Sequence, residues 1–216
     1  MQGAIIRPIF ITATNTNVGK THTTLKLIEA YSKIGIRMGV YKPIETGVED
    51  IPSDAKLLLE CCQKYNPDIS HLTPTNITAY TFELPAAPYS ADTERTIEIS
   101  KLVSKFEELS KLCDLLLIEG AGGLMVPITK SLYMIDLIEI FEADTLLVTP
   151  SRLGCINETL LSMQALKSRD ISFDWCVNLY EDREAFDSTT KPFYDTMFGS
   201  WWSVESGLDI YTRRDR

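Results

Sequence analysis

Residues 9–21 constrain the fold of this chain more than any other stretch. An apolar run is followed by a loop of small polar residues, and Gly19-Lys20-Thr21 then opens a helical pattern. A strand, a loop and a helix in this order form a phosphate cradle, because backbone N–H groups and a helix N-terminus surround anionic oxygens. In such a loop the lysine contacts the β- and γ-phosphates and the threonine hydroxyl contacts Mg²⁺. The stretch therefore predicts a nucleotide phosphate site.

The match to the usual phosphate-loop pattern is incomplete. Thr14 stands where that pattern has its first glycine, and Ala13 precedes it. A Gly-Lys-Thr tripeptide also occurs by chance in ordinary surface turns. The flanking strand and helix favour phosphate binding over that alternative, because a motif in its structural context is more specific than the motif alone.

Beyond this loop, strand patterns and helix patterns alternate, and several strands are continuous apolar runs of the kind that is buried on both faces. This alternation predicts an α/β fold: a doubly wound, mainly parallel sheet with helices on both faces, of the P-loop NTPase type. We expect one domain over residues 1–216, with an irregular, aromatic-rich tail at about 180–216. Pro43 is expected to end the second strand, and Ser53 to cap the following helix. The predicted strands are 4–11, 36–42, 78–82, 114–118, 145–149 and 173–178, and the predicted helices are 21–34, 54–63, 97–112, 134–142 and 156–167.

Polar residues follow these strands, at the edge where open α/β sheets bind their ligands. Glu119 follows an apolar strand and precedes a glycine-rich turn, which is where P-loop enzymes place an acidic Mg²⁺ partner. With Thr21 and Asp54 it offers the hard oxygen ligands that Mg²⁺ prefers. Lys20 and Lys42 offer positive charge for a transferring phosphoryl group. Taken singly, Lys42 is more simply a solvated strand-end lysine, and Asp54 a first-turn carboxylate favoured by the helix dipole.

Composition narrows the functional classes. The formal charge of −9 argues against non-specific binding to nucleic acid or acidic membranes, because both need a basic face. No secretory signal and no membrane-spanning apolar run of about 18 residues is expected. With only His22 and His71, a histidine metal centre or a Ser-His-Asp triad has little support. The five cysteines are odd in number and form no C-x-x-C pair, which predicts reduced thiols and a cytoplasmic protein.

Six segments in order along residues 4–178 resemble the dethiobiotin synthetase family. The phosphate loop alone is common to many enzymes, but the joint occurrence of all six is specific. The matching segments are Thr14-Asn-Thr-Asn-Val-Gly-Lys-Thr21, Tyr41-Lys-Pro-Ile-Glu-Thr-Gly47, Ser53-Asp-Ala55, Glu119-Gly-Ala-Gly-Gly123, Leu153-Gly-Cys-Ile-Asn157 and the strand that ends at Asn178.

The resemblance implies an ATP- and Mg²⁺-dependent ligase of biotin biosynthesis that forms dethiobiotin from 7,8-diaminopelargonate and CO₂ or bicarbonate. It implies catalytic roles for Lys42, Lys20 and Thr16, and Mg²⁺ ligands at Thr21, Asp54 and Glu119. It also implies a homodimer whose active site is shared across the interface. The implied nucleotide-binding residues are Asn17, Val18, Gly19, Lys20, Thr21, His22, Asp54, Glu119, Gly120, Ala121, Gly122 and Asn178. The implied substrate-binding residues are Thr16, Lys42, Thr46, Gly122, Gly154, Cys155, Ile156 and Asn157.

The chain departs from the family's pattern at three places. Asn17 stands where family members often carry an acidic residue, and Thr46 stands where they often carry serine. The segment after Asn178 shows no clear equivalent of the family's further strand and proline-containing loop, so base recognition is left open. The main alternative is a nucleotide-switch ATPase of the chromosome-partitioning type, which carries a second lysine in the loop; this chain has Asn15 there.

Overall fold

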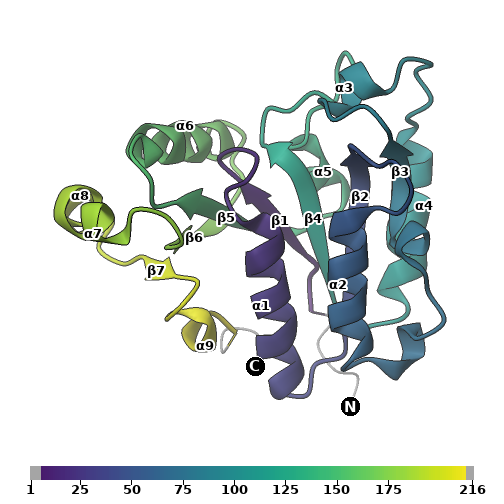
Figure 1. Ribbon diagram of the computed structural model, residues 1–216, viewed down its shortest axis with the longest axis horizontal. Helices are drawn as coiled ribbons and strands as arrows, with labels where there is room; N and C mark the ends of the chain where they lie inside the picture. The colour runs from purple at the N-terminus through teal and green to yellow at the C-terminus, as the bar shows by residue number, and fades with distance from the viewer. Residues whose placement is uncertain (1–5, 213–216) are drawn as a thin grey trace.

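The computed structural model describes residues 6–212, which form a seven-stranded sheet in the order β3-β2-β4-β1-β5-β6-β7. Every pairing between these strands is parallel (Figure 1). This confirms the predicted α/β, doubly wound fold. The strands are β1 Ile9–Ala13, β2 Met38–Thr46, β3 Thr78–Phe82, β4 Leu115–Gly123, β5 Asp144–Pro150, β6 Phe173–Asn178 and β7 Trp202–Ser203.

Helices cover both faces of the sheet, with α1 and α2 on the face toward the viewer in Figure 1 and α4 and α5 on the opposite face. The central strands β1 and β4 are therefore almost completely buried, as their apolar runs predicted. The longer helices are α1 Lys20–Lys33, α2 Ser53–Gln63, α4 Ile99–Ser110 and α6 Cys155–Lys167, and the shorter ones are α3 Pro88–Ala91, α5 Asp136–Ile140, α7 Arg183–Ala185, α8 Lys191–Met197 and α9 Leu208–Tyr211.

Two strands run further than predicted, and both extensions lead into the site. β2 continues through Pro43, because its pairing with β4 has ended at Tyr41 and its pairing with β3 joins Lys42 and Ile44 but skips the proline. β4 continues to Gly123, so Glu119 lies within the strand and does not follow it. β1 begins later than predicted, at Ile9, and residues 4 and 5 of the predicted strand lie outside the described part.

The tail predicted to be irregular is folded, and that prediction is wrong. Short helices, a π-helical turn at Phe186–Thr190 and the strand β7 follow β6. Tyr194 is fully buried, and its hydroxyl group lies 3.0 Å from that of Thr159 in α6. Its ring packs edge-on against those of Trp175, Phe186 and Phe198. Aromatic contacts of this kind bury enough area to order a short segment that lacks a long helical pattern.

Two further findings bear on the class of protein. Within residues 6–212, no helix has both the length and the apolar character that crossing a membrane requires. All five cysteines are free thiols, as predicted.

Candidate active site

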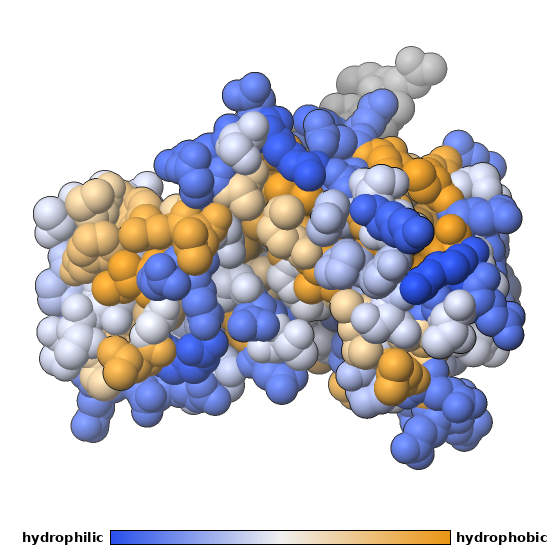
Figure 2. Space-filling model, turned by 90° about the horizontal axis from the view of Figure 1, so that it is seen from above, coloured by the Kyte–Doolittle hydropathy of each residue, from blue (hydrophilic) through white to orange (hydrophobic). Residues whose placement is uncertain are grey.

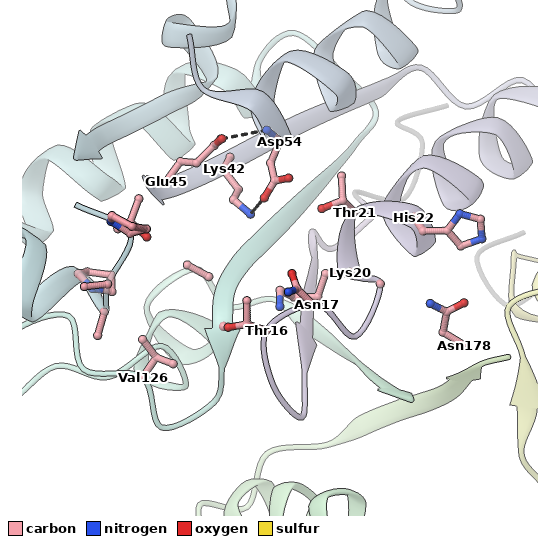
Figure 3. A pocket seen from close by; sticks show the side chains of 18 of the residues that line it. Thr16, Asn17, Lys20, Thr21, His22, Lys42, Glu45, Asp54, Val126 and Asn178 are labelled. Atoms are coloured by element: carbon pink, nitrogen blue, oxygen red, sulfur yellow. Dashed lines mark hydrogen bonds and ion pairs between the residues drawn. The ribbon is translucent and has the colours of Figure 1, made fainter. Parts of the chain in front are cut away.

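A cavity of about 800 Å³ opens at the carboxyl edge of the sheet. Its walls are the phosphate loop, the ends of β2, β4 and β6, the start of α2 and the loop before α3 (Figure 3). This is the edge at which open α/β sheets bind ligands. Twelve predicted site residues line it: Thr16, Asn17, Gly19, Lys20, Thr21, His22, Lys42, Thr46, Asp54, Ala121, Gly122 and Asn178.

The other predicted residues lie elsewhere. Val18 is buried beneath the loop, and Glu119 is buried behind the cavity wall, where it contacts the site through Lys42 and Thr21. Gly120 is the next residue of β4, and its carbonyl oxygen lies 3.4 Å from Lys42 Nζ. The four residues at the start of α6 do not line the cavity in this chain: Gly154, Cys155, Ile156 and Asn157.

The phosphate loop closes against the end of β6. Gly19 has a φ of 98°, and a Cβ atom there would lie 1.9 Å from Asn178 Nδ2, so only glycine fits. Asn178 Nδ2 donates a 3.0 Å hydrogen bond to the carbonyl oxygen of Val18. The Tyr180 hydroxyl donates to the carbonyl oxygen of Asn17 at 2.5 Å. Two residues from the end of β6 thus hold the loop in place.

Lys42 lies at the centre of the charged part of the site. Its Nζ is 2.7 Å from Glu119 Oε1 and 2.9 Å from Asp54 Oδ2, and its side chain is only 3% exposed. Burial alone would lower the pKa of Lys42, but the two carboxylates outweigh burial and raise it above the usual lysine value. Burial would raise the pKa of Asp54, but the neighbouring Lys42 ammonium outweighs burial and lowers it. Lys42 is therefore a fixed cation, unsuited to accepting a proton.

Two threonines of α1 complete the partners of the buried Glu119 carboxylate. Thr21 Oγ1 donates to Glu119 Oε1 at 3.0 Å, and Thr24 Oγ1 donates to Glu119 Oε2 at 2.8 Å. A buried carboxylate is tolerated when its lone pairs are occupied in this way. The same contacts tie the first turn of α1 to β4.

Lys20 lies in the same cavity but in a different electrostatic setting. It is 7% exposed, and its Nζ donates to the Asn15 carbonyl oxygen at 3.1 Å. Burial, followed by repulsion from Lys42, lowers its pKa to about 8. A lysine with this pKa exchanges its proton near neutral pH, unlike Lys42.

Glu45 is a site residue that the sequence interpretation missed. Its carboxylate is 5% exposed and accepts N–H groups of Asp54 and Ala55 at 2.9 and 3.0 Å (Figure 3). Ser53 was predicted as the N-cap of α2, which is wrong: Ser53 is the first helical residue, and Glu45 supplies the capping oxygens. The only sequence signal was an acidic residue two positions before Gly47 at a strand end.

The loop from Pro85 to Pro88, Val126 and Tyr180 were missed as well. The prolines, alanines and Val126 add apolar side chains to the lining, and Tyr180 lies beside the phosphate loop. No sequence pattern pointed to them, because they come from a loop, a turn and the segment after β6 that meet only in the folded chain.

The oxygen atoms near Lys42 suit a magnesium ion by their chemistry. The Thr21 hydroxyl and the Asp54 carboxylate line the cavity, and the Glu119 carboxylate lies directly behind them, in contact with Thr21 and Lys42. Within residues 6–212, no three His, Cys, Asp or Glu side chains gather into a self-sufficient metal cluster. Mg²⁺ typically takes one or two carboxylates together with phosphates and waters, so these residues fit it alongside a nucleotide.

Comparison with known proteins first gives the class. A family model described as "AAA domain" matches residues 7–174. Solved structures share the fold: a plasmid partition protein from Borrelia burgdorferi (TM-score 0.55, 14% identity, 96% of this chain and 99% of that one) and the MinC:MinD cell division complex of Aquifex aeolicus (TM-score 0.52, 16% identity, 98% and 86%). At these identities the likeness concerns the fold alone. The protein is thus of the P-loop nucleotide-binding class.

Curated relatives then give the family. An ATP-dependent dethiobiotin synthetase of Sulfurovum sp. is 59% identical over 205 residues, covering 95% of this chain and 98% of the relative. The synthetase of Wolinella succinogenes is 39% identical, covering 96% and 97%, and one from Helicobacter pylori is 36% identical, covering 87% and 88%. The chain belongs to the family of ATP-dependent dethiobiotin synthetases, as its motifs predicted.

The lowered pKa of Lys20 predicts a pH dependence of nucleotide binding. Below about pH 8 Lys20 is protonated and attracts the phosphates, whereas above it binding must first restore the proton. We expect the affinity for ADP to fall by up to about tenfold per pH unit above pH 8. Titration calorimetry between pH 7 and 10 measures this. Lys20→Met should bind more weakly and lose the slope; a flat wild-type profile would contradict the prediction.

Proposed function

We propose that this chain forms dethiobiotin from ATP, CO₂ and 7,8-diaminopelargonate, through a carbamate and its phosphoric anhydride. The observation that carries this proposal is the presence of two lysines in one cavity. Lys20 ends the phosphate loop, and Lys42 lies in β2, where two carboxylates hold it. Family membership supplies the identity of the substrates. We also propose that residues 1–216 act as one domain.

The reaction needs two group transfers at one place. One amine of the substrate captures CO₂ as a carbamate and releases a proton. A carbamate oxygen attacks the γ-phosphorus, and ADP leaves. The second amine then attacks the carbamate carbon, the C–O bond to phosphate breaks, and the ureido ring closes. Negative charge lies on the carbamate and on the phosphoryl group throughout, so fixed cations beside both are the main contribution that a protein can make.

The phosphate loop binds the nucleotide in this proposal. Thr16, Asn17 and Gly19 of the loop line the cavity, and so do Lys20 and Thr21 at the N-terminus of α1, a position that suits phosphate oxygens. Asn178 is nearly buried, and its Oδ1 has no hydrogen-bond partner among the described residues. A free acceptor at this position suits the amino group of adenine better than the carbonyl oxygen of guanine. This supports ATP as the co-substrate.

Lys42 stabilises the carbamate and the phosphoryl group during its transfer. Lys42 lines the cavity, and its contacts with Asp54 and Glu119 keep the ammonium charged and in place before any ligand binds. Thr16 and Thr46 lie on the cavity wall with hydroxyl groups that hydrogen-bond the diamine or the carbamate. Asn17 cannot accept a proton as a carboxylate would, so the protons released by the amines leave to water.

Thr21, Asp54 and Glu119 would hold Mg²⁺ with the ATP phosphates. The ion would supply charge neutralisation between the β- and γ-phosphates. Lys42 contacts both carboxylates, so its ammonium group and the proposed magnesium ligands belong to one hydrogen-bond network. The network links Asp54, which lines the cavity, to the buried Glu119 and, through Glu119, to Thr21 at the start of α1.

We further propose a homodimer in which α6 of one subunit completes the site of the other. Figure 2 shows hydrophobic side chains gathered at the left, the side on which α6 and α8 lie in Figure 1. Leu153 is 89% exposed and Leu161 is 63% exposed, a large apolar area to leave in water. The start of α6, from Gly154 to Asn157, is absent from its own cavity wall. Its N-terminus would bind the substrate carboxylate across the interface.

The partition-type switch ATPase is the competing interpretation. The likeness of fold supports this interpretation no more than it supports any other function of a P-loop protein. Asn15 stands where the switch ATPases carry their second lysine. The Asn15 carbonyl oxygen accepts from Lys20 of the same chain, which is a contact within the loop. We place the enzyme in the cytoplasm and assign it no nucleic-acid partner, on the basis of its −9 charge and its free thiols.

The substrate dependence of ATP consumption tests the function. We expect ADP release that requires both 7,8-diaminopelargonate and bicarbonate, with one dethiobiotin formed per ADP, because the phosphoryl acceptor exists only when both are present. Coupled ADP detection and mass spectrometry measure the two products. The assay is repeated with GTP and CTP to test the base preference. Steady ATP hydrolysis that ignores both substrates would favour the switch ATPase.

Lys42→Gln tests the second lysine. The amide removes the charge but retains an N–H donor for Glu119, so the buried carboxylate keeps a hydrogen-bond partner, at a cost in stability that thermal unfolding measures. We expect turnover to fall by about 10²-fold or more, while ADP affinity changes little. Steady-state kinetics and calorimetry measure the two quantities. Lys26→Gln makes the same change on the exposed face of α1 and serves as the control. Near-normal turnover of Lys42→Gln would make this lysine a bystander.

The dimer proposal predicts the effect of a charge on α6. Leu161→Glu should yield a monomer in analytical ultracentrifugation, because burying an unpaired carboxylate at the interface is unfavourable. The monomer should retain ADP binding and lose ring closure. Glu60→Asp, a conservative change at an exposed position of α2, is the control. A fully active monomer would contradict a shared site.

A further inference from the structure

The N-terminus of α2 is held by a residue from another element. Pro52 occupies the N-cap position and supplies no side-chain hydrogen bond to the free N–H groups of the first turn. Glu45 of β2 supplies both acceptors: Oε1 receives Asp54 N at 2.9 Å, and Oε2 receives Ala55 N at 3.0 Å. The hydroxyl of Ser53 adds a longer contact of 3.3 Å to Oε1.

This arrangement decides what the Asp54 carboxylate is free to do. The free N–H groups at a helix N-terminus need acceptors from outside the helical hydrogen-bond ladder, and a side chain at the N-cap position commonly supplies them. Here Glu45 already occupies those groups. The Asp54 side chain instead faces the cavity, where Oδ2 lies 2.9 Å from Lys42 Nζ (Figure 3).

We propose that Glu45 is a positioning residue of the reaction, which fixes the backbone of Asp54 so that its carboxylate faces Lys42 and the proposed magnesium position. The inference rests on the proposed function, in which Asp54 is a magnesium ligand. Glu45 contacts neither phosphate nor substrate in this role. Its whole effect passes through Asp54, in the way that outer hydrogen-bond partners orient metal ligands.

The three residues involved come from two consecutive elements. Lys42 and Glu45 lie near the carboxyl end of β2, and Asp54 lies in the first turn of α2, after a short connection. The 3% exposure of the Lys42 side chain and the 5% exposure of Glu45 leave both in fixed positions. Without Glu45, the N–H groups of Asp54 and Ala55 lose their acceptor, and the first turn of α2 is no longer held to β2. A shift of that turn moves the Asp54 carboxylate relative to Lys42.

The test compares Glu45→Ala and Glu45→Gln with a matched control at the other end of the same two elements. Asn66 is fully buried; its Nδ2 donates to Met38 O at the start of β2, and its N–H donates to Cys62 O near the end of α2. Asn66→Ala thus removes a buried polar contact between β2 and the segment after α2, far from the cavity, and keeps the backbone bond to Cys62. Thermal unfolding of all three variants reports the structural cost.

Two readouts separate positioning from stability. The first is the Mg²⁺ concentration that gives half-maximal dethiobiotin formation at saturating ATP. The second is the gain in ADP affinity on adding Mg²⁺, measured by calorimetry, which needs no turnover. We expect Glu45→Ala to raise the half-saturating Mg²⁺ concentration by about tenfold or more and to shrink the calorimetric gain. Glu45→Gln, which keeps one acceptor oxygen, should shift both less. Asn66→Ala should leave both unchanged.

Three results would contradict a positioning role for Glu45. Equal Mg²⁺ dependence in wild type, Glu45→Gln and Glu45→Ala would overturn the proposal, as would an equal shift in Asn66→Ala. An increased KM for the diamine with unchanged Mg²⁺ dependence would also overturn it, because Glu45 would then contact the substrate. If Glu45→Ala does not fold, Glu45→Gln alone carries the comparison. If the wild type forms no dethiobiotin, the proposed function fails, while the calorimetric readout still tests Glu45.

Discussion

The buried contact between Lys42 and Glu119 is the interaction on which the site depends. Two opposite charges, 3% and 0% exposed, lie 2.7 Å apart at the carboxyl edge of the central strands. Taking both out of water is unfavourable unless every remaining lone pair and proton is occupied. Thr21, Thr24 and Asp54 supply those partners. The pair thereby joins β2, β4, α1 and α2 around one point, and it gives the cavity a cation that keeps its charge.

The two lysines differ although they share a cavity, and the difference follows from their partners. Lys42 is matched by carboxylates, which raise its pKa, whereas Lys20 has a carbonyl oxygen and a neighbouring cation, and burial lowers its pKa to about 8. One lysine is thus permanently charged before any ligand arrives. The other is protonated below about pH 8 and loses its proton above that pH when no phosphate is bound. A ligase that handles an anionic carbamate and a polyphosphate has use for both kinds of cation.

The surrounding elements act mainly by holding backbone in place. Asn178 and Tyr180 hold the phosphate loop from β6, and Glu45 holds the first turn of α2 from β2. The folded tail packs its aromatic rings on β6 and α6, which supports the side of the molecule with the exposed leucines. Precise placement of a few catalytic groups therefore draws on contacts spread over most of the sheet.

The α/β class, the phosphate loop and twelve of the residues that line the cavity were predictable from the sequence. Local patterns report strand and helix periods, and parallel strands bring their carboxyl ends to one edge. Positions such as Asn17 and His22 came instead from the family resemblance. Three features emerge only in the folded chain: β2 passes through Pro43, Glu45 and not Ser53 caps α2, and the tail forms β7. Those features depend on which segments of the folded chain lie beside each residue. A proline is tolerated where no ladder bond is lost, a cap is supplied by whichever oxygen is near, and an aromatic segment folds only against a surface that packs it.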